Sequence, residues 1–92
     1  MKETTLTVKH KVGLHARPAA KFVKAAKQFD SDIQISNITR GGDRVSAKSL
    51  VSLVKIAVAC GHQVHITADG SDEDQAIDAL TEFIVNTMEE QP

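Results

Sequence analysis

The stretch Gly13-Leu14-His15-Ala16-Arg17-Pro18-Ala19-Ala20 marks the point where one sequence periodicity gives way to another. Before it, Leu6 and Val8 alternate with polar residues, which is the period of a half-buried strand whose apolar side faces the core. After it, apolar residues recur at helical spacing from Ala16 to about Phe29. A proline in the first turn costs little, because that turn has no partner for the missing N–H. The stretch therefore predicts a strand, a loop and the start of a helix.

The same stretch collects residues that suit a reaction with an anion. The imidazole of His15 titrates near neutral pH when unperturbed and can act as a nucleophile. Arg17 offers a planar fork for phosphate or carboxylate oxygens. The start of a helix adds free backbone N–H groups and the positive end of the helix dipole. We therefore interpret the stretch as a site where an anion meets a nucleophilic imidazole.

Downstream of the first helix, the pattern predicts two strands joined by a hairpin. Ile33 and Ile35 alternate with polar residues in the first of these strands. The glycines of Arg40-Gly41-Gly42-Asp43 suit the positive φ angles of a hairpin loop, and Arg44–Ala47 forms the short strand after it. Ile38 is out of phase with the earlier isoleucines, which indicates a bulge or an irregular strand end.

The second half of the chain predicts a helix, a strand and a final helix. The helix from Ser49 to about Ala59 has more apolar residues than one buried stripe needs, so some of them are either buried elsewhere or exposed for docking. Val64 to Ala68 alternates as a fourth strand. Ser71–Asp74 supplies an N-cap and an acidic first turn for a helix that reaches Met88. The order β-α-β-β-α-β-α predicts an α+β, two-layer, open-faced β-sandwich with three helices on one face of a four-stranded sheet.

Composition and charge are those of one small domain, residues 1–92, with a single core. A net charge of −1 offers no case for nucleic-acid binding. Lysines follow the motif whereas acids crowd the region after Asp69, which predicts a basic face for an acidic partner. Cys60 is the only cysteine and fits a reducing compartment. With no apolar leader and no run of transmembrane length, we expect a cytoplasmic protein without direct membrane insertion.

Two blocks resemble the HPr family, the histidine-containing phosphocarrier proteins of the bacterial phosphotransferase system. They are Gly13-Leu14-His15-Ala16-Arg17-Pro18-Ala19-Ala20 and Ser46-Ala47-Lys48-Ser49-Leu50, and the likeness in spacing and length covers nearly the whole chain. The resemblance implies an antiparallel sheet. It also implies that His15 accepts a phosphoryl group at Nδ1 from phosphorylated Enzyme I and passes it to sugar-specific EIIA proteins. In that case the helix start at Ala16, Arg17 and Pro18 binds the phosphoryl oxygens, and the chain is a carrier rather than an enzyme in its own right.

The resemblance further implies a partner-docking surface with an apolar centre and a basic rim. We call this set the docking surface: Ala20, Lys24, Lys27, Lys48, Leu50, Val51 and Val54. Ser49 matches a position that an ATP-dependent kinase phosphorylates in some branches of the family, and a phosphate there would place negative charge inside the docking surface. Two features depart from the family pattern: the hairpin at Arg40–Asp43 is a few residues longer, and Ala57 replaces a usual glycine.

Other interpretations stay open beside this one. Ser49 also suits an ordinary helix N-cap, and the apolar members of the docking surface also suit a core. A regulatory adaptor controlled by Ser49 phosphorylation and bound to transcriptional regulators, or a carrier of a nitrogen-regulatory branch, is an alternative function. An RNA-binding sheet face is disfavoured because it would have no aromatic residue for stacking. His62 and His65 fall on opposite faces of a strand, so we expect no metal site and no other cofactor.

Overall fold

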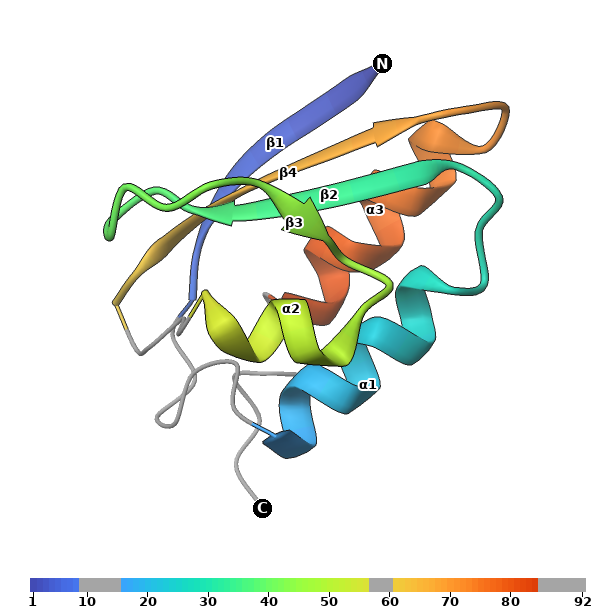
Figure 1. The fold of residues 1–92 in the computed structure, drawn as a ribbon. Helices are drawn as coiled ribbons and strands as arrows, with labels where there is room; N and C mark the ends of the chain where they lie inside the picture. The colour runs from blue at the N-terminus through green and yellow to red at the C-terminus, as the bar shows by residue number, and fades with distance from the viewer. Residues whose placement is uncertain (9–15, 57–60, 85–92) are drawn as a thin grey trace.

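The computed structural model describes residues 1–8, 16–56 and 61–84. The strands form one layer and the helices form a second layer on one side of it, as Figure 1 shows. This arrangement confirms the predicted α+β open-faced sandwich. The elements along the chain are β1 (Lys2–Thr7), α1 (Ala16–Ala26), β2 (Asp32–Asn37), β3 (Val45–Ser46), α2 (Leu50–Lys55), β4 (Gln63–Asp69) and α3 (Glu73–Glu82).

The sheet has the strand order β1-β4-β2-β3, and every neighbouring pair is antiparallel. β4 pairs with both β1 and β2, so it lies inside the sheet. Its register places Ile66 opposite Ile35 and Val64 opposite Leu6. Because side chains alternate between the two faces of a strand, these apolar residues share the face that the helices cover.

The core lies between that face and the three helices. α1 buries Phe22 and α3 buries Leu80, and the ring of Phe22 meets that of Phe83 edge to face, with 5.7 Å between centroids. α2 contributes one fully buried residue, Leu53. α1 contacts both α2 and α3, and therefore lies between them. The other buried apolar residues are Val8, Ala19, Val23, Ala26, Ile33, Ile35, Ala47, Val64, Ile66, Ala68, Ala76, Ile77 and Ile84.

Several element boundaries differ from the predicted ones. The α-helix of α1 ends at Ala26, and Phe29 is reached through a tighter turn in which its N–H donates to the carbonyl of Ala26, three residues back. Phe29 still packs against the core, which explains why it extends the helical periodicity. β3 contains only Val45 and Ser46.

The start of α3 agrees with the prediction, because its N-cap is Asp72, within Ser71–Asp74, and Glu73 and Asp74 supply the acidic first turn. α2 is helical as far as Lys55, and the predicted end near Ala59 lies outside the described residues. The same holds for Met88 at the predicted end of the final helix.

Asn37 explains why Ile38 is out of phase with the strand before it. β2 ends at Asn37, and its fully buried side chain lies on the helix-facing side of the sheet. Its amide nitrogen donates to the carbonyl of Ile56 at 3.1 Å and lies 3.0 Å from Nδ1 of His62. Its Oδ1 accepts the N–H of Arg40 at 3.3 Å. Asn37 thus joins the end of α2 to the sheet and to the hairpin, while Ile38 is 45% exposed in the turn.

The Asp72 carboxylate joins the loop after α1 to the loop after β4. It accepts the N–H of Asp30 at 2.8 Å, the N–H of Ser31 at 2.9 Å and the hydroxyl of Ser31. These hydrogen bonds, led by the one from the Ser31 hydroxyl, lower the pKa of Asp72. Gly70 lets the two loops approach, because a Cβ at this position would lie 2.7 Å from Cα of Ser31.

Asp72→Asn is expected to lower the midpoint of urea unfolding at pH 7, because an amide presents a donor where the carboxylate only accepts. Since the folded-state pKa of Asp72 is lowered, its stabilisation is present above the ordinary carboxylate pKa, about 4, and is lost as pH falls through the folded value. The stability of the variant should therefore fall less steeply in acid. Asp78→Asn, an exposed site on α3, is the control. Equal acid dependence for wild type and Asp72→Asn would contradict the prediction.

Candidate functional site

The start of α1 is the part of the predicted phosphoryl site that the structure describes. The helix begins at Ala16, directly after His15 in the sequence, as predicted. The backbone of Ala16, Arg17 and Pro18 forms its first turn. His15 itself, together with Gly13 and the side chains of these three residues, lies outside the described part. The roles of His15 and Arg17 stay predictions.

The apolar residues of α2 divide into one buried residue and three exposed ones. Leu53 is fully buried, whereas Leu50 is 40% exposed, Val51 72% and Val54 43%. Residues three and four apart are neighbours on a helix surface, so Val54 lies next to both Leu50 and Val51 and the three exposed side chains form one group. Of the two alternatives left open by the sequence, core or surface, these residues are at the surface.

Three members of the docking surface form a row along α1 and the turn directly after it. Ala20 and Lys24 on α1, and Lys27 just after its end, are exposed and follow the spacing i, i+4, i+7. Phe22 faces α3 through Phe83. α1 contacts α2 as well as α3. The basic row and the exposed apolar residues of α2 therefore occupy neighbouring helices, as the arrangement in Figure 1 makes visible.

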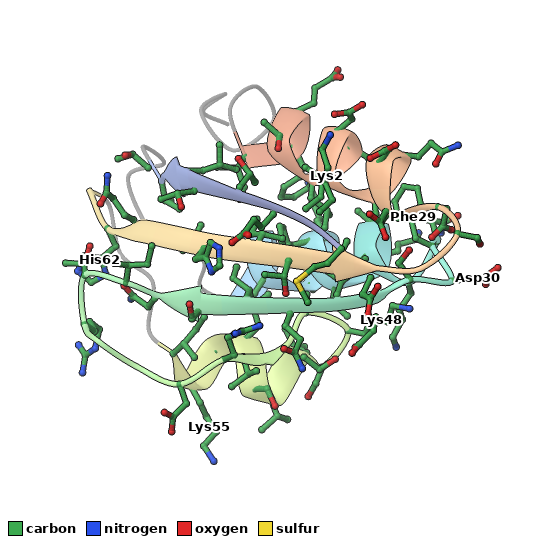
Figure 2. The ribbon with its side chains drawn as sticks, turned by 90° about the horizontal axis from the view of Figure 1, so that it is seen from above. Lys2, Phe29, Asp30, Lys48, Lys55 and His62 are labelled. Carbon is green, nitrogen blue, oxygen red and sulfur yellow. The ribbon has the colours of Figure 1, made fainter. Side chains whose placement is uncertain are left out.

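Lys48 differs from the other lysines of the docking surface. It is half-buried, and its Nζ donates to the backbone carbonyl of Phe29 at 2.7 Å. Figure 2 shows Lys48, Phe29 and Asp30 toward one end of the sheet, with His62 and Lys55 toward the other. The ammonium of Lys48 is thus bound to a backbone carbonyl of the chain itself, at the turn that follows α1.

Ser49 is the N-cap of α2. Its backbone is extended, with φ −115° and ψ 115°, and its Oγ accepts the N–H of Ser52 at 3.3 Å. The carbonyl of Ser49 accepts the N–H of Leu53 at 3.0 Å. The interpretation of Ser49 as an N-cap is confirmed, and a regulatory role for its hydroxyl stays a prediction.

The remaining histidines with described side chains lie apart from this surface. His65 faces Glu3 of the neighbouring strand, with Nε2 and Oε1 separated by 2.7 Å. His62 contacts Asn37 at the end of β2. Within the described ranges, no three metal-ligating side chains come together.

None of the described helices combines the length and the apolarity that a membrane crossing requires.

Comparison with known proteins places these features in a family. Residues 2–86 match the family model of the PTS HPr component phosphorylation site. The chain is 50% identical over 72 residues to phosphocarrier protein HPr of Haemophilus influenzae, covering 78% of this chain and 81% of that protein. It is also 43% identical over 86 residues to the multiphosphoryl transfer protein of the same organism, of which it spans only 17%.

A solved structure shares the whole fold. The crystal structure of HPr-C-His from Thermoanaerobacter tengcongensis matches with a TM-score of 0.91 at 40% identity, and each chain covers 100% of the other. At 40% identity with full coverage of both chains, the similarity indicates common ancestry as well as a shared fold. The match across residues 2–86 and the agreement of fold show that the chain belongs to the HPr family of phosphocarrier proteins.

Proposed function

We propose that this chain carries a phosphoryl group on Nδ1 of His15, between phosphorylated Enzyme I and EIIA proteins. The family match over residues 2–86, which includes the His15 motif, is the observation that carries the proposal. In each step the bond from phosphorus to the donor breaks as the bond to the acceptor nitrogen forms. The identity of the EIIA protein that accepts the group separates a sugar-uptake branch from a nitrogen-regulatory branch.

The first turn of α1 supports this role because it offers hydrogen-bond donors beside His15. The N–H groups of a first helical turn have no partner inside the helix, and the dipole makes that end positive. Ala16 and Arg17 can donate such N–H groups, while Pro18 gives up nothing by lacking one. The Arg17 guanidinium would add a fork for phosphoryl oxygens. Phosphoryl transfer depends mainly on positioning and charge stabilisation, so the partners can supply the rest.

The docking surface supports the same proposal by its chemistry. Leu50, Val51 and Val54 provide an exposed apolar centre on α2. A basic rim comes from Lys24 on α1 and Lys27 directly after it. Interfaces that form and separate commonly combine an apolar centre with a charged rim. The rim favours acidic partners and speeds their association.

Ser49 lies at the edge of this surface, directly before Leu50, so a phosphoryl group on its hydroxyl would bring negative charge to the apolar centre. An acidic partner would then meet both like charge and an added desolvation cost. We therefore include Ser49 phosphorylation by a kinase as a means of weakening Enzyme I binding and of favouring transcriptional regulators as partners.

His15→Ala is expected to take no phosphate from Enzyme I and phosphoenolpyruvate, because the accepting nitrogen is gone. The wild-type protein should gain an acid-labile, base-stable phosphate, measured as a mass increase of the intact protein. His65→Ala, which removes a histidine from the sheet, is the matched control and should label as wild type. Full labelling of His15→Ala would place the phosphate elsewhere. A wild-type protein that takes no label but binds regulators would support the adaptor function instead.

Val51→Asp is expected to weaken Enzyme I binding about tenfold, as for a residue at the centre of an interface. Because Val51 is already 72% exposed, the melting temperature should stay close to that of the wild type. Ile38→Asp, another exposed apolar residue but on the hairpin, is the matched control and should leave the affinity unchanged. Titration calorimetry measures both affinities, and equal losses for the two variants would argue against a docking surface on α2.

Two substitutions at Ser49 should separate its capping role from its regulatory role. Ser49→Ala removes the hydrogen bond to Ser52 and should lower the free energy of unfolding by about 1 kcal/mol, while Enzyme I affinity stays near the wild-type value. Ser49→Asp keeps a capping oxygen but adds charge, so it should retain stability and lose affinity. If Ser49→Asp binds Enzyme I as tightly as wild type does, charge at this position does not regulate docking.

A further inference from the structure

One peptide group, between Phe29 and Asp30, is bound on both of its polar sides. Its carbonyl, from Phe29, accepts a hydrogen bond from Nζ of Lys48 at 2.7 Å. Its N–H, from Asp30, donates to Oδ2 of Asp72 at 2.8 Å. The peptide therefore lies between a cation from the turn before α2 and a carboxylate from the N-cap of α3.

This arrangement is electrostatically cooperative. The cation meets the negative end of the peptide dipole and the carboxylate meets the positive end, so each hydrogen bond polarises the peptide in favour of the other. Hydrogen bonds to charged groups are also shorter and stronger than neutral ones. The peptide follows the last turn of α1, so that turn is joined to the segments that precede both other helices.

Lys48 is well placed to control where α2 begins. The segment before α2 is a compact turn in which Oγ of Ser46 accepts the N–H of Lys48 at 3.2 Å. The carbonyl of Ser46 accepts the N–H of Ser49, the N-cap, at 3.3 Å. A restraint on the Lys48 side chain is therefore passed directly to the cap of α2 and to the first residues of the docking surface.

We propose that Lys48 is a positioning residue, whose bond to the Phe29 carbonyl holds the start of α2 against the end of α1. The bond keeps Leu50 and Val51 in register with the basic row on α1. The inference rests on the proposed function. As a member of the docking surface alone, Lys48 would contact carboxylates of the partner, whereas here it binds the Phe29 carbonyl of its own chain. Removing a lysine that positions α2 and removing a lysine that contacts the partner should change the binding kinetics in different ways.

The test compares Lys48→Met with the wild type in two measurements. In the free protein, amide hydrogen exchange at Ser52 and Leu53, whose N–H groups bond to Ser49, should accelerate because the cap is less restrained. In the complex with Enzyme I, koff should rise roughly three- to tenfold, the range for a positional change passed to a binding site. The salt dependence of kon should stay that of the wild type.

Three variants serve as references. Lys24→Met removes an exposed cation of the docking surface and should lower kon and its salt dependence, with exchange at Ser52 unchanged. Lys55→Met removes an exposed cation at the other end of α2 and should change neither the exchange nor the binding kinetics. Lys48→Arg keeps a charged donor for the Phe29 carbonyl and should restore part of the slow exchange and of the slow koff.

The proposal is overturned if Lys48→Met behaves as Lys24→Met does, with a lower kon, a weaker salt dependence and unaltered exchange. It is equally overturned if Lys48→Met matches Lys55→Met in both measurements. The exchange measurement needs no partner. If the wild-type chain fails to bind Enzyme I, the proposed function fails, while exchange in the free protein still decides whether Lys48 tethers α2.

Discussion

The described helices of this fold bury their apolar side chains against one face of the sheet and, in part, against one another. β2 and β4 supply most of that surface through Ile33, Ile35 and Ile66, and α1 with α3 covers much of it. α2 is six residues long and reaches the core through Leu53 alone. Its other apolar side chains, Leu50, Val51 and Val54, stay exposed and form the apolar centre of the proposed docking surface.

A helix as short as α2 has little stability of its own, because it forms few hydrogen bonds to offset the conformational entropy that is lost when its first turn is ordered. Polar contacts at both of its ends compensate. Before its start, Lys48 is bonded to the Phe29 carbonyl and Ser49 caps the first turn. After its end, Asn37 donates to the carbonyl of Ile56. The exposed face of α2 can therefore be presented to partners without being packed against anything.

This design suits a carrier that must dock with different partners and then leave them. An apolar centre that is held by contacts beneath it loses little conformational freedom on binding, so affinity does not require a large interface. The proposed phosphoryl site at His15 then needs only to be brought into line with the partner's reacting group. In the proposed function, the chain would present the phosphoryl group and the docking surface, and the partner would complete the reacting geometry.

The sequence by itself determined the fold class, the element order and the N-cap at Ser49, because strand and helix periods and capping chemistry are local properties. Local pattern was less reliable where a side chain packs on the core beyond the last residue of the α-helix. Phe29 keeps the helical spacing by packing on the core although the α-helix has already ended at Ala26.

Only the tertiary structure decided which apolar side of α2 is buried, since amphipathicity cannot say how much sheet surface remains to be covered. The same holds for the partners of Lys48 and Asp72. Lys48 is 19 residues from Phe29 in the sequence, and Asp72 is 42 residues from Asp30. Such a contact leaves no periodic pattern in the sequence. The charged side chain binds a backbone N–H or carbonyl, and nearly every residue has these groups.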